Sequence, residues 1–325
     1  MNRIPFIHQT DLFRPHEDPD DHFDLATAYS LHLSGHYDLK GILIDYPPPH
    51  HDGVPDQPGI EMLNHITGLD VPFAVGQEAP MADHHTGETN NAVQFLVRIL
   101  EASDTPVVLN LVGSCRDVAI AARRYPDLFR DKCRAIYLGA GTGCPASEAG
   151  DEVEYNVRLD VGAFVSLFDA PCPIYWCPCF EKLGVGMRVH EFGTWYTFAQ
   201  RDILPSIAPQ LQSYFAYMFS CDRDPDWKKW LDPERFGPVI EHQRLKLRPM
   251  WSTAGMLHAA GLALPDVFSF ERAAVSCTSD GHTAWRPDDS SSVRVFRIYD
   301  QEDYREKMPA VLRDLMIRLS SALRC

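Results

Sequence analysis

The sequence lacks any long apolar run, and it has little positive charge. None of its stretches reaches the roughly 18 or more consecutive apolar residues of a membrane-spanning helix. Only 30 Lys and Arg stand against 45 Asp and Glu, which gives a formal net charge of −15. Nucleic-acid backbones and anionic membrane surfaces are bound by basic patches, so this charge argues against both as partners.

Cysteine is present, but without the spacing of a disulfide framework. The nine Cys residues are an odd number at irregular intervals, which is typical of a chain in a reducing compartment. No basic segment followed by an apolar one, the pattern of a secretory signal, is visible near Met1. We therefore expect a cytoplasmic protein. Cys172, Cys177 and Cys179 lack the C-x-x-C pairs of a structural zinc site, and we expect buried thiols there.

Apolar residues make up 45% of the chain and aromatic residues 11%, which excludes a disordered protein. Short apolar runs alternate with amphipathic segments along most of the sequence. The predicted strands are 4–7, 39–44, 71–75, 105–112, 135–139, 173–177 and 293–298, and the predicted helices are 24–33, 91–101, 118–124, 161–168 and 309–323. This alternation predicts an α/β fold with a mostly parallel sheet flanked by helices.

No linker or internal repeat divides the sequence, so we expect a single domain over residues 1–325. Residues 47–59 are rich in Pro and Gly and are predicted to form a loop. From about 185 to 265 the pattern becomes helical and aromatic, and it includes the stretch HEFGTWYTF. We expect a helical elaboration there, whose aromatic side chains belong to the core or stack on a ligand.

Several carboxylates follow the first predicted strand. Asp11 comes directly after it, and Asp18, Asp20, Asp21 and Asp24 follow before or within the first helix. In parallel sheets, ligands bind beyond the carboxyl ends of the strands. One Asp could cap the helix, but a single cap cannot use all of them. Carboxylates that converge need protons or a cation, and their hard oxygens suit Ca²⁺ or Mg²⁺.

The chain resembles a known family in six segments that occur in collinear order, the last of which is VRVFRIYDQEDY. TDLFRPHEDPDD resembles the motif D-x-D-x-x-x-D-D, and VPFAVGQEAPM, PVVLNLVGSCRDVAIAARRYPDLF, AIYLGAGTG and EYNVRLDVGAF resemble later segments. Together they are similar to the nucleoside hydrolase superfamily, the inosine-uridine-preferring N-ribohydrolases and their relatives. The resemblance covers nearly the whole chain and implies a Rossmann-like core.

The resemblance also implies roles for particular residues. Asp11 matches a calcium ligand that activates the attacking water, and Asp21 matches a second calcium ligand. Asp20, Glu154 and Asn156 match residues that bind the sugar. The implied reaction is hydrolysis of the N-glycosidic bond of a ribonucleoside by metal-activated water, with Ca²⁺ as cofactor. The implied partner is a small nucleoside or ribosyl substrate, and the implied assembly is a homodimer or homotetramer.

Three departures from the family pattern lie in the first part of the chain. Gln9 occupies the position of the motif's first Asp, and the segment between Asp11 and Asp20 is longer than in the motif. The second predicted strand is followed by Asp45, with no sign of the Gly-Asn that touches the ribose in the family. Asp45 or Asp18 could compensate for the late carboxylate that the family has and that this chain lacks at Ser252.

A fourth departure falls late in the chain, at Trp251 and Ser252. The family has a His-Asp pair at this position, and its Asp binds calcium and sugar. Loss of a carboxylate weakens a hard-cation site, because affinity depends on the charge of the ligands. The alternative function is therefore a catalytically inactive or repurposed protein of the same fold that binds a sugar or nucleoside.

Two other features suggest sites. The His50–His51 and His84–His85 pairs are expected to lie in surface loops, because neither has a spaced third zinc ligand, although one of them could act as a proton donor. GAGTG at 139–143 does not have dinucleotide-binding spacing, and we interpret it as a close-packed turn at a strand end.

Overall fold

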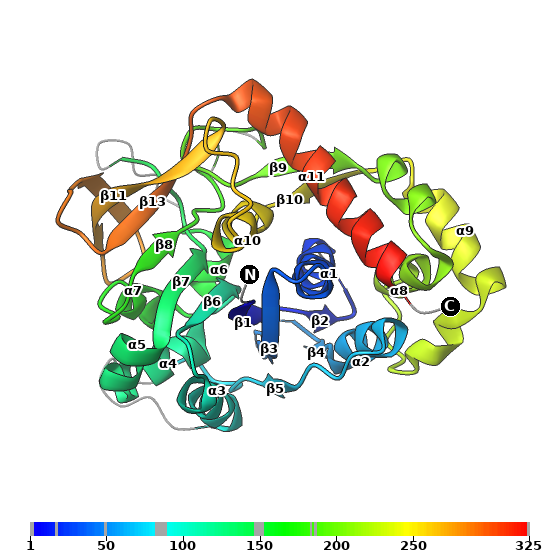
Figure 1. The fold of residues 1–325 in the computed structure, drawn as a ribbon, viewed down its shortest axis with the longest axis horizontal. Helices are drawn as coiled ribbons and strands as arrows, with labels where there is room; N and C mark the ends of the chain where they lie inside the picture. Colours follow the sequence, from blue (N-terminus) through cyan, green and yellow to red (C-terminus); the bar gives the residue numbers. More distant parts are fainter. Residues whose placement is uncertain are drawn as a thin grey trace.

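A nine-stranded sheet forms the centre of the computed structural model, which describes residues 3–16, 19–48, 51–81, 90–145, 153–182, 184 and 187–323 (Figure 1). The strand order is β12-β11-β13-β8-β7-β6-β1-β3-β5. The strands are β1 (Ile4–Thr10), β3 (Tyr37–Ile44), β5 (Phe73–Val75), β6 (Val107–Val112), β7 (Cys133–Gly139), β8 (Ile174–Trp176), β11 (Phe268–Cys277), β12 (Thr283–Pro287) and β13 (Val293–Ile298). The pairs from β5 to β13 are parallel, and β11 pairs antiparallel with β13 and β12. The predicted mostly parallel α/β sheet is confirmed.

Helices cover both faces of this sheet. On one face lie α1 (Asp20–Leu33), α10 (Thr253–Ala259) and α11 (Gln301–Ala322), and on the other lie α3 (Asn91–Ala102), α4 (Arg116–Arg124), α5 (Pro126–Lys132) and α7 (Val161–Leu167) (Figure 1). Successive side chains of a strand point to opposite faces, so Phe6 belongs to the first core and Ile7 to the second. This two-sided burial explains why the central strands are continuous apolar runs in the sequence.

The segment between β8 and β11 supplies most of the helical elaboration. It contains α8 (Pro209–Phe219), α9 (Pro233–Gln243), three short 3-10 segments and the two-stranded sheet of β9 (Tyr196–Ala199) and β10 (Leu247–Met250). The aromatic stretch HEFGTWYTF is a turn followed by β9, so its prediction as helix was wrong. Its side chains do belong to the core: Phe198 lies against Phe23, which stacks on Phe215 of α8.

Two further differences from the sequence prediction concern Pro-containing segments. The predicted loop at 47–59 contains β4 (Val54–Pro55), which pairs with β2 (Phe13–Arg14), and it runs into the first turn of α2 (Gln57–Thr67). The last helix was predicted to start at Pro309 but begins at Gln301, where the side chain of Asp300 accepts the Asp303 amide. No helix in the described ranges combines the length and the apolar character needed to cross a bilayer.

Candidate functional site

The fold places a topological switch point between β1 and β6. From β1 the chain adds β3 and β5 on one side, and it then returns to the other side with β6, β7 and β8. Gln9 on β1 lies beside Leu43 of β3 and Leu111 of β6. The two connections leave in opposite directions, so a crevice opens at the carboxyl ends of β1 and β6.

A pocket of about 230 Å³ lies at this edge of the sheet. All five residues proposed from the sequence for catalysis, cation binding and sugar binding line it. Its lining residues are Asp11, Asp20, Asp21, Val112, Gly139, Glu154, Tyr155, Asn156, Cys179, Phe180, Trp251 and Ser252. The structure therefore brings together carboxylates from residues 11–21 and polar groups from residues 154–156.

Asp20 and Asp21 occupy the first turn of α1. The residue before the helix is Pro19, so neither Asp is the N-cap that the sequence allowed as an alternative. Carboxylates in this turn interact favourably with the helix dipole. The hydroxyl of Thr10 donates to Oδ1 of Asp21 at 3.4 Å, and Asp20, Asp21 and Asp24 bring carboxylate oxygens within 4.8 Å of one another. Asp18 lies outside the described residues.

The carboxyl group of Asp11 has a strongly shifted pKa. Removal from water and the negative charge of Asp45 raise it from 3.8 to about 7, the charge of Glu154 adds to the rise, and hydrogen bonds to backbone and to Asp21 oppose it. Asp45 itself is buried and does not line the pocket; its oxygens accept the side chain of Gln9 and the amide of Ser114. Too much negative charge is thus gathered near Asp11 for all carboxylates to ionise easily without a cation.

Glu154 and Asn156 are positioned by α6 (Tyr155–Leu159). Glu154 caps this helix: its carboxylate accepts the amides of Gly141 at 2.8 Å, Asn156 at 3.0 Å and Val157 at 3.4 Å. Burial raises the pKa of Glu154, and these three amides act in the opposite direction. Asn156 donates from Nδ2 to the carbonyl of Gly139 at 3.0 Å. Gly141 has φ +84°, so GAGTG forms a strand-end turn that supports the pocket.

An aromatic wall closes part of the pocket. It consists of Tyr155, Phe180 and Trp251, and the rings of Phe180 and Trp251 meet edge to face at 5.8 Å. Trp251 and Ser252 thus lie at the site, at the position where the family resemblance implies a His-Asp pair. Sequence reasoning missed Phe180 as a site residue. The available signal was its place just after β8, at the same carboxyl edge as Asp11.

The cysteine and histidine predictions have mixed outcomes. Cys172, Cys177 and Cys179 are buried free thiols, as predicted, and Cys179 also lines the pocket. His51 contacts the ring of Phe13 and is not among the pocket residues. His50, His84 and His85 lie outside the described residues.

Comparisons with known proteins give a partial match in sequence and full-length matches in structure. No family model matches the chain. A pyrimidine-specific ribonucleoside hydrolase, RihA of Enterobacter sp. (strain 638), is 28% identical over 141 residues, which are 35% of this chain and 43% of that relative's length. The match therefore spans less than half of the relative.

Solved structures match over the full length. A plant nucleoside hydrolase, PpNRh1, has a TM-score of 0.58 at 14% identity, with 98% of this chain and 99% of that chain covered. The type III effector XopQ, solved in complex with adenosine diphosphate ribose, has a TM-score of 0.57 at 15% identity, with 99% and 95% covered. The protein has the fold of these nucleoside hydrolases, and the predicted resemblance to that superfamily is confirmed.

Proposed function

We propose that the protein hydrolyses the N-glycosidic bond of a ribonucleoside or a related N-riboside. The observation that carries this proposal is the convergence of residues from separate parts of the chain on one pocket at the switch point of the sheet. These residues are Asp11, Asp20, Asp21, Glu154 and Asn156. The similarity to a ribonucleoside hydrolase over 141 residues supports the same activity.

The donor set of the pocket fits a hard divalent cation. Asp11 and Asp21 would hold it, since both line the pocket and their side chains contact each other. Their ligand atoms are carboxylate oxygens, which Ca²⁺ prefers. The raised pKa of Asp11, about 7, indicates that this carboxyl group lacks sufficient compensating positive charge in the protein alone. Ca²⁺ is accordingly the proposed cofactor, and when bound it would lower the pKa of a water molecule that it coordinates.

The residues of the chain have distinct tasks in the proposed reaction. Asp11 accepts the proton of the attacking water, as a general base. Asp20, Glu154 and Asn156 bind the ribose hydroxyls, because carboxylate and amide groups supply the acceptors and donors that vicinal hydroxyls need. Their negative charges stabilise the oxocarbenium-like sugar that forms as the glycosidic bond breaks. Tyr155, Phe180 and Trp251 offer an apolar wall on which a planar leaving group can stack.

A second candidate function is binding without hydrolysis. Ser252 lines the pocket where the family has a carboxylate, which reduces the negative charge available to a cation. The same fold is found in the effector XopQ, which was solved with adenosine diphosphate ribose. A protein of this kind would retain the sugar contacts of Asp20 and Asn156 but turn no substrate over.

Release of ribose from a panel of purine and pyrimidine ribonucleosides, with millimolar Ca²⁺, tests the proposal. We expect hydrolysis of at least one of them, and a loss of about 10²-fold to 10⁴-fold in Asp11→Ala, because the general base is removed. Asp127→Ala is the matched control, since the side chain of Asp127 is 85% exposed and remote from the pocket lining. Saturable ribose binding without any ribose release would favour the second candidate and refute the first.

Cytoplasmic location and a homodimeric or homotetrameric state accompany this proposal as predictions from the sequence. Size-exclusion chromatography with light scattering measures the oligomeric state directly.

A further inference from the structure

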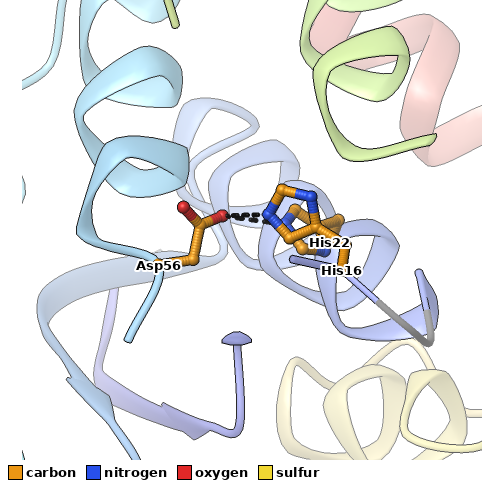
Figure 2. A group of neighbouring side chains, drawn as sticks. All are labelled: His16, His22 and Asp56. Atoms are coloured by element: carbon orange, nitrogen blue, oxygen red, sulfur yellow. Dashed lines mark hydrogen bonds and ion pairs between the residues drawn. The ribbon is translucent and has the colours of Figure 1, made fainter. Parts of the chain in front are cut away.

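Two histidines and an aspartate meet in a buried cluster beside the acidic pocket (Figure 2). His16 follows β2, His22 lies in the first turns of α1, and Asp56 is the N-cap of α2. Figure 2 shows both imidazole rings directed at the carboxylate of Asp56. Their Nε2 atoms lie 2.6 Å and 3.2 Å, respectively, from the same oxygen, Oδ2. The three side chains are at most 1% exposed.

Neighbouring groups hold two of these side chains in the orientation of metal ligands. Nδ1 of His16 lies 3.1 Å from the carbonyl of Met218, to which it donates a hydrogen bond, so Nε2 is the ring nitrogen directed at Asp56. The second oxygen of Asp56, Oδ1, accepts the hydroxyl of Tyr217 at 3.2 Å and the amide of Gly59 at 3.3 Å. Ligating His and carboxylate groups in metalloproteins are oriented by hydrogen bonds of this kind.

Several groups converge on the one buried carboxylate of this cluster. Nε2 of His16 lies 2.6 Å from Oδ2 of Asp56, and the guanidinium of Arg14 lies 3.6 Å from Oδ1 of the same carboxylate. His22 is buried, and its Nε2 faces Oδ2 of Asp56 at 3.2 Å. Its Nδ1 has no hydrogen-bond partner among the described residues. One carboxylate thus faces two imidazoles and a guanidinium.

We propose that His16, His22 and Asp56 bind a transition metal ion, Zn²⁺ being the reference case, at a site separate from the acidic pocket. Two imidazoles and one carboxylate are a ligand set for such ions, whereas the pocket offers only carboxylate oxygens of the kind that suit Ca²⁺. The proposal does not depend on the proposed function.

The cluster needs only a small adjustment to accept the ion. Ligands about 2.0 to 2.1 Å from a tetrahedral zinc lie about 3.3 Å apart. His22 and Asp56 already have this separation, and His16 and Asp56 must separate by less than about 1 Å. Arg14 does not block the ion, because it approaches Oδ1 while the imidazoles approach Oδ2. A bound ion would link three segments: the residues that follow β2, helix α1, and the start of α2. It would therefore stabilise the long connection that precedes Asp20.

Metal content of the full-length protein tests this proposal. The protein is dialysed against micromolar Zn²⁺ with an excess of Ca²⁺, which competes for the carboxylate pocket but not for imidazole nitrogen. We expect one bound zinc per chain by mass spectrometry of the metal. With Co²⁺ in its place, we expect visible absorption bands of a nitrogen-ligated ion at one equivalent. The Co²⁺ spectrum of the wild type tests the site even if a variant does not fold.

Three variants assign the ligands. We expect His22→Gln and Asp56→Asn to lose more than about 100-fold in Zn²⁺ affinity, and Tyr217→Phe, which alters a supporting hydrogen bond, to lose about 10-fold. The control is His65→Gln, an exposed histidine of α2 outside the cluster, which should bind Zn²⁺ normally. Absence of stoichiometric zinc and of the Co²⁺ bands in the wild type, or unchanged affinity in both ligand variants, would overturn the proposal and identify the cluster as a hydrogen-bonded network.

Discussion

Gln9 donates a hydrogen bond from Nε2 to Oδ1 of Asp45 at 2.7 Å, and this bond joins the ends of the neighbouring strands β1 and β3. The amide of Ser114, beyond β6, donates to the other oxygen of Asp45. Asp45 is therefore held by neutral donors, and its negative charge acts on Asp11, whose pKa it raises. The carboxylate absent at Gln9 has a counterpart on the adjacent strand, within the electrostatic reach of Asp11.

The charge of Asp45 should contribute to cation binding although Asp45 does not line the pocket. We expect Asp45→Asn to weaken Ca²⁺ binding about tenfold, which corresponds to about 1.4 kcal/mol, because a buried charge near the cation is lost. Titration calorimetry at about pH 8, where Asp11 is ionised in both proteins, measures the effect. Asp127→Asn removes the same charge from an exposed position and should leave the affinity unchanged. Equal affinities of wild type and Asp45→Asn would contradict this electrostatic role.

Stabilisation by Ca²⁺ should depend on pH. The pKa of Asp11 is about 7 in the folded protein and near 3.8 in the unfolded chain, so the folded state binds more protons between these values. In metal-free protein, the contribution of Asp11 to stability is therefore lost as the pH rises through this window, and a cation restores it. We expect millimolar Ca²⁺ to raise the melting temperature more at about pH 7.5 than at about pH 5. A shift of the same size at both pH values would count against cation binding at Asp11.

Arg116 and Asp160 form a buried ion pair that joins the first residue of α4 to the N-cap of α7. Nε of Arg116 lies 2.8 Å from Oδ2 of Asp160, and both side chains are at most 4% exposed. Arg116 also donates to the carbonyls of Gln77 and Leu159. We expect Arg116→Met to lower the free energy of unfolding by about 3 to 5 kcal/mol, because it leaves the Asp160 carboxylate buried without its partner.

An exposed ion pair in the same protein provides the control for Arg116. Arg130 and Asp127 approach to 2.6 Å, but their side chains are 59% and 85% exposed. Arg130→Met should therefore cost less than about 1 kcal/mol. Urea denaturation of the two variants compares them directly, and similar losses would show that burial does not set the strength of the Arg116 pair.

Asp11 and Asp45 both lie so close to Gly113 that this position requires glycine. Its φ is +90°, and a Cβ there would lie 2.5 Å from Oδ2 of Asp45 and 2.8 Å from Cβ of Asp11. We expect Gly113→Ala to lose about 3 kcal/mol or more of stability and to weaken Ca²⁺ binding, because strain and displacement of both acids add together. Gly35→Ala is the matched control, since φ is +81° but nothing lies within 4 Å of the added atom. It should lose only the cost of strain, about 1 to 2 kcal/mol, without any effect on Ca²⁺.

The sequence predicts the central strands and the acidic pocket well, because both depend on patterns within short stretches of the chain. Asp11 follows an apolar run directly, and parallel topology then places it with groups that follow other runs. Strand β11, which lies between β12 and β13, was missed because its side chains are only partly buried and do not alternate cleanly. Helix α2 was missed altogether: its first residues fall in the predicted loop because their Pro and Gly resemble a loop, although Asp56 caps the helix and Pro58 lies in its first turn.

Contacts between distant parts of the chain were beyond the sequence patterns. His16 and Asp56 are 40 positions apart, and no spacing rule relates them. The same holds for Gln9 and Asp45, whose contact depends on the register of β1 with β3. The sequence suggested Asp45 as a compensating carboxylate. Its neutral hydrogen-bond donors and its position outside the pocket lining depend on how the strands pair, which the sequence patterns do not show.

Ser252 allows the missing carboxylate to be put back. Its side chain lines the pocket, and the residue is the N-cap of α10, a position that favours Asp. We expect Ser252→Asp to fold and to bind Ca²⁺ at least about tenfold more tightly, because one more hard anionic oxygen faces the cation. Ser252→Asn introduces a side chain of nearly the same size without the charge, so it isolates the electrostatic effect. If both variants bind Ca²⁺ alike, or if Asp weakens binding, then the cation does not lie within reach of residue 252, and Asp11 and Asp21 hold it from the other side of the pocket.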